Sequence, residues 1–282
     1  MLKPNGGVCE TLITFFLEKT MELPRWLDIL IYDGLNANYC PSYADMTNID
    51  DDKEKALNYL GTYFPRSYAE SYCIFNEYFN SHPNELSDKE DIAIFDFGSG
   101  TGGEIFGLLT VLDECFPNIK KVQIVALDGN SNALRLYERI LSEFKTLCRF
   151  EIKSRPAQIV IDDFYDLSIL DSVLEETFDI IISFKAICEF VPKKQFEEQN
   201  PYKHIANFLL PKLNSNGLLL LEDVTFFSDT SQEWLPTMMD NGLKAVDCTI
   251  VLKNNGFNQS YYITHSHKHN DKSKVAWRMI KQ

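Results

Sequence analysis

The residues of this chain that are best placed to do chemistry surround a group of glycines. The segment GSGTGG, residues 98–103, directly follows the apolar run IAIFDF and precedes a helix-like run. Glycines at such a turn make room for a ligand or for another segment of the chain. Asp128 ends the next apolar run, KVQIVALD, where a carboxylate can accept hydrogen bonds from both hydroxyl groups of a ribose. This combination predicts a site for a cofactor that contains a nucleoside.

Two kinds of cofactor fit the spacing of the glycines. Gly98, Gly100 and Gly103 match the G-x-G-x-x-G pattern of dinucleotide-binding domains, which points to NAD. However, Asp96 lies two residues before the first glycine and Glu104 lies in the first helical turn, where negative charge repels a pyrophosphate. Acids at these positions favour a cationic cofactor without phosphate groups, while the glycine spacing alone leaves both cofactors open.

Strands and helices alternate around this turn. The apolar runs DIAIFDF, KVQIVALD, FDIIISF and GLLLLED have the length of buried strands, and segments with helical or irregular patterns separate them. This alternation predicts a doubly wound, mostly parallel, Rossmann-like α/β sheet. Two further runs, QSYYITHS and KVAWRMIKQ, are joined by the polar segment HKHNDKSK and predict an antiparallel hairpin at the edge of the sheet.

The chain before this sheet has a different pattern. Apolar residues in 8–80 follow helical spacing that Pro24, Pro41 and Pro65 interrupt, and the polar stretch 81–91 marks a boundary. We therefore predict a helical N-terminal cap over 1–88 and a cofactor-binding domain over 89–282.

Composition narrows the class of protein. The hydrophobic share of 45% and the charged share of 24% are those of a soluble globular protein. The net charge of −14 makes free nucleic acid an unfavourable partner. Seven scattered cysteines without a CxxC pair indicate reduced thiols and predict a cytoplasmic protein. The sequence shows no signal-peptide pattern and no apolar stretch of about 18 residues, so we expect no membrane span.

The order of the motifs resembles that of class I S-adenosylmethionine-dependent methyltransferases. DFGSGTGGE, ALDGNS, FDIIISFKAICEFV and LLPKLNSNGLLLLED follow one another as in that family, over about 90–282, and the expected C-terminal hairpin at 259–282 also resembles it. The resemblance implies a seven-stranded sheet, S-adenosylmethionine as the cofactor and a methyl acceptor as the substrate. It assigns these residues to the cofactor: Asp96, Gly98, Ser99, Gly100, Gly102, Asp128, Gly129, Asp163 and Ser183.

Within this assignment, Asp163 is preferred over Asp162 as the acid near the adenine because an aromatic residue follows it. Lys185 and Glu189 follow the fourth strand, where the resemblance places the reacting methyl group, and we predict them as catalytic residues. For Cys188, which lies between them, a small apolar side chain is the preferred interpretation over a nucleophile.

The acceptor is not identified by these motifs. The strand-four signature D/N-P-P-Y/F of enzymes that methylate amino groups of nucleic acids is replaced by SFKAICEF, so a small molecule or a protein is the preferred acceptor. In the cap, Tyr63 and Arg66 flank Pro65. They form a packing cluster, or else they contact the cofactor, with Arg66 pairing with the methionine carboxylate.

Other readings stay open at this point. YLGTYFPRSYAESY, residues 59–72, together with SFKAICEFVP, is similar to the ribosomal small-subunit-associated methyltransferase-like family. A catalytically silent binding module and an NAD-dependent oxidoreductase are further alternatives. His265, His267 and His269 alternate along one segment, for which a solvated hairpin tip is preferred over a metal site.

Overall fold

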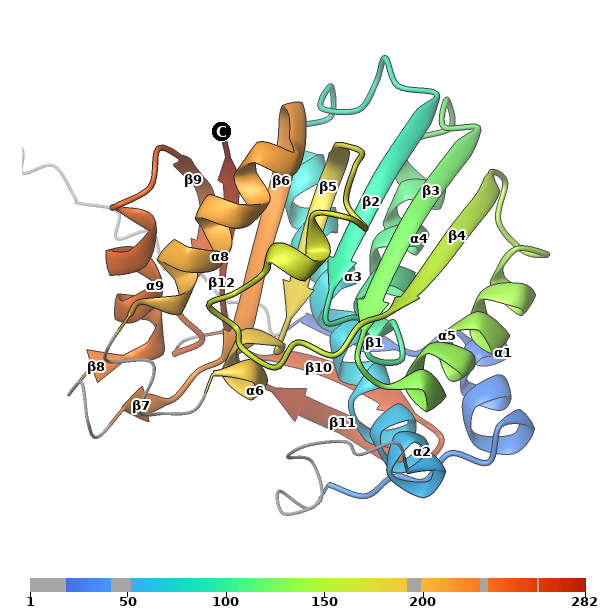
Figure 1. Ribbon diagram of the computed structural model, residues 1–282. Helices are drawn as coiled ribbons and strands as arrows, with labels where there is room; N and C mark the ends of the chain where they lie inside the picture. The colour runs from blue at the N-terminus through green and yellow to red at the C-terminus, as the bar shows by residue number, and fades with distance from the viewer. Residues whose placement is uncertain (1–18, 42–51, 192–198, 229–232, 258) are drawn as a thin grey trace, which may run out of the picture.

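The computed structural model of this protein describes residues 19–41, 52–191, 199–228, 233–257 and 259–282. Seven strands form the main sheet (Figure 1). Their order across the sheet is β4 (Glu151–Gln158), β3 (Lys121–Asp128), β2 (Asp91–Phe97), β5 (Phe178–Phe184), β6 (Leu213–Val224), β12 (Val275–Lys281) and β9 (Thr249–Asn254).

Only β12 runs antiparallel to its neighbours, β6 and β9, so the sheet is mostly parallel. Helices α3 (Phe64–Ser81), α4 (Gly103–Cys115) and α5 (Ser131–Phe144) cover one face, and α8 (Pro201–Leu209) and α9 (Leu235–Leu243) cover the other (Figure 1). The predicted doubly wound α/β fold is confirmed.

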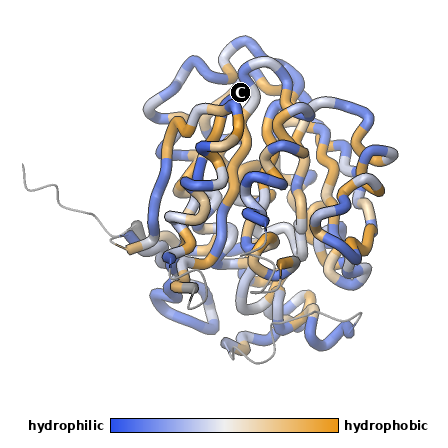
Figure 2. Tube along the Cα trace, turned by 60° about the vertical axis from the view of Figure 1, so that its left-hand side comes forward, coloured by the Kyte–Doolittle hydropathy of each residue, from blue (hydrophilic) through white to orange (hydrophobic). Residues whose placement is uncertain are grey.

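The core lies on both faces of the sheet because its central strands β2, β5 and β6 carry long, almost uninterrupted apolar runs. Successive residues of β2 supply the two layers in turn: Ile94 belongs to the apolar cluster beneath α3 and α4, whereas Phe95 belongs to the one beneath α8 and α9. Figure 2 shows the same distribution, with hydrophobic residues along the strands and hydrophilic residues at the outer loops. A strand buried on both sides has this composition rather than an alternating one.

The C-terminal strands pair differently from the predicted hairpin. Strands β10 (Tyr261–His265) and β11 (Lys268–Ser273) pair with each other and, through β10, with β1 (Lys19–Glu22), in a separate three-stranded sheet. Strand β12 enters the main sheet instead, because six of its seven residues are buried and need cover on both faces. The polar sequence of β11 predicts a loop, because Asp271 is the one buried residue of this strand and an apolar pattern is lacking.

The N-terminal part is mainly helical, as predicted, where the structure describes it. It contains α1 (Arg25–Ile29), the π-helical turn η1 (Leu30–Gly34), α2 (Lys53–Thr62) and α3; residues 8–18 of the predicted helical region lie outside the described residues. Because β1 pairs with β10, both ends of the chain build the cap. The boundary at residue 88 remains a prediction.

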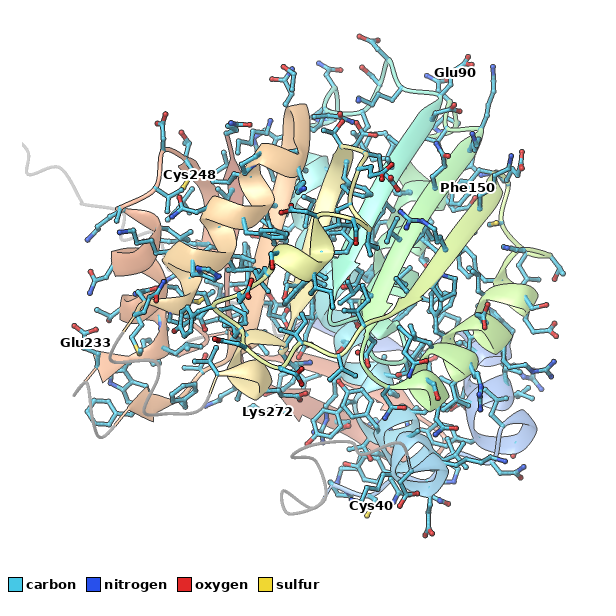
Figure 3. The ribbon with its side chains drawn as sticks, viewed as in Figure 1. Cys40, Glu90, Phe150, Glu233, Cys248 and Lys272 are labelled. Carbon is cyan, nitrogen blue, oxygen red and sulfur yellow. The ribbon has the colours of Figure 1, made fainter. Side chains whose placement is uncertain are left out.

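The part of the cap formed by α2, β10 and β11 lies at the carboxyl edge of the parallel strands, whereas α3 lies along a face of the main sheet (Figure 1). Figure 3 shows Cys40 and Lys272 at this edge, while Glu90, just before β2, lies at the opposite edge. The remaining short elements are η3 (Ser168–Leu170), α6 (Ile187–Phe190), η4 (Leu210–Lys212), β7 (Phe227–Ser228) and β8 (Glu233–Trp234). Among the helices that the structure describes, none is long and apolar enough to cross a membrane.

Helix α3 packs unusually close to α4 because two glycines face it. A Cβ atom on Gly103 would lie 2.5 Å from the carbonyl oxygen of Phe64, and one on Gly107 would lie 2.4 Å from that of Tyr68. Both distances are far below a normal contact, and backbone atoms cannot turn aside as a side chain can. The bare backbone at Gly103 therefore makes room for another segment of the chain.

We predict that Gly107→Ala lowers the free energy of unfolding by about 1–2 kcal/mol in chemical denaturation. Overpacking costs about 1–3 kcal/mol, which outweighs the gain of up to about 1 kcal/mol in helix propensity. The control is Gly129→Ala, where the nearest atom to the new Cβ would be 3.6 Å away. Equal stability of the two variants would contradict the close α3–α4 approach.

Candidate functional site

The predicted glycine turn joins β2 to α4 at the carboxyl edge. The backbone N–H groups of Gly98 and Ser99 both donate to the carbonyl oxygen of Leu127, at 2.9 and 2.8 Å, which anchors the turn to β3. Gly98, Gly100 and Gly102 have φ angles of 79°, 47° and 83°, in the left-handed region that favours glycine. The turn therefore needs glycine at these positions for its own geometry.

Asp128 braces this turn from the end of β3. One of its carboxylate oxygens accepts from the N–H of Gly100 and the other from the N–H of Asn130, both at 2.7 Å. Burial raises the pKa of Asp128, and these two donors act in the opposite direction. Each oxygen keeps a second lone pair, so the carboxylate can still accept from a ligand.

Asp96 and Glu104 form a carboxyl pair beneath the turn. The Asp96 side chain is fully buried, and in the described part of the chain no N–H or hydroxyl group donates to either of its oxygens. Burial and the neighbouring Glu104 raise the pKa of Asp96 well above its usual value, and burial raises the pKa of Glu104 to about 8. The pair therefore holds protons near neutral pH, although the charge of the nearby Lys185 lowers the pKa of Glu104 in part.

Lys185 lies beside this pair, directly after β5, and has a left-handed φ of 56°. Its Nζ contacts the Glu70 carboxylate and the Ser67 hydroxyl of α3, the latter at 3.1 Å, and lies 3.9 Å from a carboxylate oxygen of Glu222. Burial lowers the pKa of Lys185, but the charges of Glu70 and Glu222 outweigh it and raise the pKa. Lys185 thus stays a cation and ties the cap to the sheet, a role that the sequence did not predict.

We call Glu70, Asp96, Glu104 and Glu222 the acid cluster. All four are buried, and Lys185 is the cation engaged with them. Burial, followed by the charge of Glu70, raises the pKa of Glu222 well above its usual value.

Hydroxyl groups near the acid cluster are also unsatisfied. Ser99 and Thr101 in the turn and Ser183 on β5 are buried, and their oxygens have no hydrogen-bond partner within the described ranges. Buried polar atoms without partners are uncommon and indicate a place for a ligand or for water.

Tyr59 of α2 covers the turn, and the sequence analysis missed it. Its ring lies 3.3 Å from the position that a Cβ on Gly100 would occupy, and it stacks on Tyr63 with ring centroids 5.1 Å apart. Burial and the charges of Glu189 and Glu104 raise the pKa of its hydroxyl well above the usual value. The available signal was the four-residue spacing of the two tyrosines, which places both on one face of a helix.

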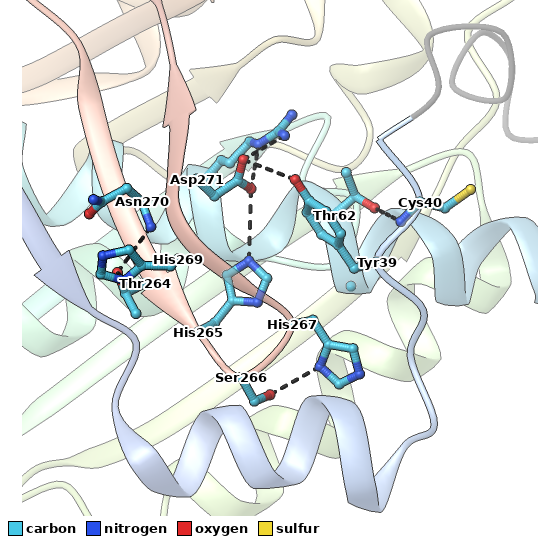
Figure 4. Close-up of polar contacts among 12 residues, drawn as sticks. Tyr39, Cys40, Thr62, Thr264, His265, Ser266, His267, His269, Asn270 and Asp271 are labelled. Atoms are coloured by element: carbon cyan, nitrogen blue, oxygen red, sulfur yellow. Dashed lines mark hydrogen bonds and ion pairs between the residues drawn. The ribbon is translucent and has the colours of Figure 1, made fainter.

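Arg66 is paired within the protein. Its Nε and Nη2 donate to the two carboxylate oxygens of Asp271 on β11, both at 2.8 Å, and Tyr39 also donates to that carboxylate (Figure 4). The Asp271 side chain is only 3% exposed. The guanidinium also lies over the Tyr63 ring. These contacts support the packing interpretation of Arg66 rather than the pairing with a cofactor carboxylate.

His265 is buried, so the prediction of a solvated hairpin tip is wrong for this residue, whereas His267 and His269 are exposed. The Tyr32 hydroxyl donates to the Gly61 carbonyl oxygen at 2.6 Å, because Pro65, one helical turn later, has no N–H to offer it. The hydroxyl therefore accepts from Nδ1 of His265, 2.8 Å away, and Nε2 faces Asp271 at 3.8 Å. Within the described residues no His, Cys, Asp or Glu group could hold a metal ion.

The remaining predicted residues lie around the turn or beyond it. Glu189 is exposed on α6, although surrounding protein and then the charges of Asp128 and Asp223 raise its pKa to about 8. Asp163 is exposed in a turn after β4 and accepts from the N–H of Tyr165 at 2.9 Å. Burial and Asp223 raise the pKa of the Cys188 thiol well above its usual value, which disfavours a nucleophilic thiolate.

Comparisons with known proteins find distant structural similarity only. No protein-family model matches the chain, and no match is found among curated proteins. The magnesium protoporphyrin IX methyltransferase ChlM of Synechocystis, with bound S-adenosylhomocysteine, is 8% identical over 91% of this chain and 98% of its own, with a TM-score of 0.48. With bound S-adenosylmethionine it is 10% identical over 91% and 97%, with a TM-score of 0.45.

A further similar structure comes from work on the conversion of a disulfide bond into a thioacetal group during echinomycin biosynthesis. It is 12% identical over 74% of this chain and 81% of its own, with a TM-score of 0.46. Identities and TM-scores this low carry no argument about the chemistry of the present chain, which must come from its own residues.

We predict that Glu104→Gln flattens the pH dependence of stability. Between pH 4.5, the ordinary pKa of a glutamate, and about 8, the folded protein holds a proton that the unfolded chain has lost, so stability falls as pH rises. Denaturant titrations from pH 5 to 8 should show the slope reduced by up to about 1.4 kcal/mol per pH unit. Glu114→Gln, at an exposed position of the same helix, should leave the slope unchanged; parallel curves for all three proteins would contradict the assignment.

We also predict that Arg66→Ala lowers the free energy of unfolding by roughly 3 kcal/mol, because Asp271 would lose its bidentate partner while remaining buried. Thermal and denaturant unfolding measure this loss. Arg135→Ala, at an exposed site on α5, is the matched control and should change stability by less than about 0.5 kcal/mol. A loss of ligand binding without a loss of stability would restore the ligand-pairing role for Arg66.

Proposed function

We propose that this protein is an S-adenosylmethionine-dependent methyltransferase. The observation that carries the proposal is the Asp96–Glu104 carboxyl pair, buried at the glycine turn, with both Asp96 oxygens lacking a hydrogen-bond donor among the described residues. A ligand that brings an ammonium and a sulfonium group to this place would lower the pKa of both carboxyl groups and give them a cationic partner. S-adenosylmethionine has both groups and a ribose for Asp128.

The same features argue against a dinucleotide. A pyrophosphate would bind at the N-terminus of α4, where Gly103 already faces the Phe64 backbone of α3. At Gly102, the Tyr137 ring lies 2.6 Å from the position that a Cβ atom would occupy. The two acids nearby would repel it further. The sheet order also departs from the dinucleotide-binding order, because the last strand, β12, is inserted antiparallel between β6 and β9.

Each part of the cofactor would have its own partners in this arrangement. Asp96 and Glu104 would hold the ammonium group, Asp128 the ribose hydroxyls, and Asp163 or Asp162 the adenine amine. Tyr59, stacked on Tyr63 over the turn, would exclude water from the reacting centre. This matters because water could otherwise compete with the acceptor for the methyl group. When bound, S-adenosylmethionine supplies an electrophilic methyl group.

Glu189 is the residue we propose to meet the acceptor. It is exposed at the carboxyl edge, and its raised pKa of about 8 suits a group that takes up a proton near neutral pH. A small molecule or a protein side chain is the proposed acceptor, since the carboxyl groups of Asp128, Glu189 and Asp223 at this edge would repel a phosphate backbone. Lys185 would act by positioning, because its Nζ is already engaged by Glu70 and Ser67.

Titration calorimetry with S-adenosylmethionine, S-adenosylhomocysteine and NAD tests the proposal directly. We expect the purified protein to bind the first two and to give no heat with NAD. Tight binding of NAD without a response to the other two ligands would overturn the proposal. Binding of S-adenosylmethionine without methyl transfer to any fraction of a cell extract would indicate a silent binding module instead.

We predict that Asp128→Asn weakens S-adenosylmethionine binding by roughly 1.5–3 kcal/mol, because the ribose loses a charged acceptor and the turn loses part of its brace. Calorimetry on the folded variant, checked by circular dichroism, measures the change. Asp88→Asn, at an exposed position before β2, should bind like the wild type. Unchanged affinity in the Asp128 variant would mean that the ribose is bound elsewhere.

A further inference from the structure

A proton holds together the carboxyl groups of Asp96 and Glu104 at the glycine turn. Asp96 is completely buried and Glu104 is 5% exposed. Neither oxygen of Asp96 receives a hydrogen bond from the residues that the structure describes. Because an isolated buried carboxylate is too costly to persist, Asp96 keeps its proton and donates a hydrogen bond to Glu104.

The ionisable groups around this pair do not replace that proton. Lys185 lowers the pKa of Glu104 in part, but its Nζ already contacts Glu70 and the Ser67 hydroxyl. Burial raises the pKa of both neighbouring tyrosines, which therefore stay neutral. The neighbours other than Lys185 are acids or phenols from every element packed against the pair: Tyr59 on α2, Glu70 on α3, Asp128 on β3, Tyr137 on α5, Glu189 on α6 and Glu222 on β6.

Two buried hydroxyl groups in the same turn also lack partners. The oxygens of Ser99 and Thr101, each in a side chain that is 1% exposed, make no hydrogen bond within the described ranges. Buried polar atoms of this kind indicate a place for a ligand or for water. An ammonium group has three N–H donors, so a ligand that carries one could supply the hydrogen bonds that Asp96 and these hydroxyls lack.

We infer that Glu104 determines specificity for the amino group of the cofactor, which binds in exchange for the proton that Glu104 shares with Asp96. The inference rests on the proposed function, which assigns the ammonium group to these two residues. The ammonium keeps its own protons and the carboxyl proton leaves to solvent, so the pair becomes an anion with a cationic partner. Because a proton is released, affinity should rise with pH below about pH 8, where the free protein still holds that proton on Glu104.

Three nucleosides that differ in the chain attached to sulfur test this inference. S-adenosylhomocysteine carries an ammonium and a carboxylate group, its decarboxylated analogue carries the ammonium alone, and methylthioadenosine carries neither. In calorimetry between pH 6 and 7, the affinity of the first two should rise about fivefold, while that of methylthioadenosine should change by less than about twofold. Titrations of S-adenosylhomocysteine at pH 7 in buffers of different ionisation enthalpy should show the release of about one proton per ligand.

The three ligands separate the possible failures. An equal rise for all three would place the released proton on another group, and a rise for S-adenosylhomocysteine alone would attribute it to the carboxylate. Either result, or an affinity for S-adenosylhomocysteine that does not depend on pH, would overturn the inference while leaving cofactor binding established. No binding of S-adenosylhomocysteine or S-adenosylmethionine at any pH would overturn the proposed function instead.

The variant Glu104→Gln separates proton exchange from a merely structural role. The glutamine amide can donate to Asp96 without a titratable proton, so Asp96 is ionised before the ligand arrives. The variant should still bind S-adenosylhomocysteine, with an affinity that changes by less than about twofold between pH 6 and 7. Glu114→Gln, at an exposed position of the same helix, should keep the wild-type rise. A wild-type rise in Glu104→Gln would contradict the inference, and if this variant does not fold, the comparison of the three ligands decides.

Discussion

The burial of charged side chains is the constraint on which the structure at the carboxyl edge of this sheet depends. Isolated buried carboxylates are too costly to persist, so they are neutralised by shared protons or by a cation. Here Lys185 supplies the cation from a left-handed position after β5, and Glu70 and Ser67 bring α3 to it. The cap helix is therefore part of the charged interior, and its removal would leave Lys185 with Glu222, 3.9 Å away, as its partner in place of Glu70 and Ser67.

The close approach of α3 and α4 is what makes this pairing possible. Gly103 and Gly107 let the two backbones meet, and the Ser71 hydroxyl donates to the Glu104 carbonyl oxygen at 2.7 Å, at the same crossing. The glycine-rich segment thus has two roles. Its first part, at Gly98 and Gly100, forms a turn that only glycine accommodates easily, and its last part admits a neighbouring helix.

Contacts run without a break from the second, smaller sheet to the glycine turn. Asp271 on β11 holds Arg66, Arg66 lies over Tyr63, Tyr63 stacks on Tyr59, and Tyr59 covers Gly100. The C-terminal hairpin is therefore coupled physically to the candidate cofactor site, although more than 150 residues separate the two in sequence. Because the hairpin also pairs with β1, the cap joins segments from both ends of the chain.

The sequence by itself determined the alternation of strands and helices, the glycine turn and the acids Asp96 and Asp128, because these depend on local patterns: uninterrupted apolar runs, left-handed φ angles and residues at strand ends. Tertiary structure decided what local patterns do not contain. Strand β11 has almost no apolar signal and is held by backbone pairing, and Arg66 meets its partner 205 positions away. Likewise, the partners of Lys185 are Glu70 on α3 and Glu222 on β6, so only the folded structure shows that its charge is paired with buried carboxylates.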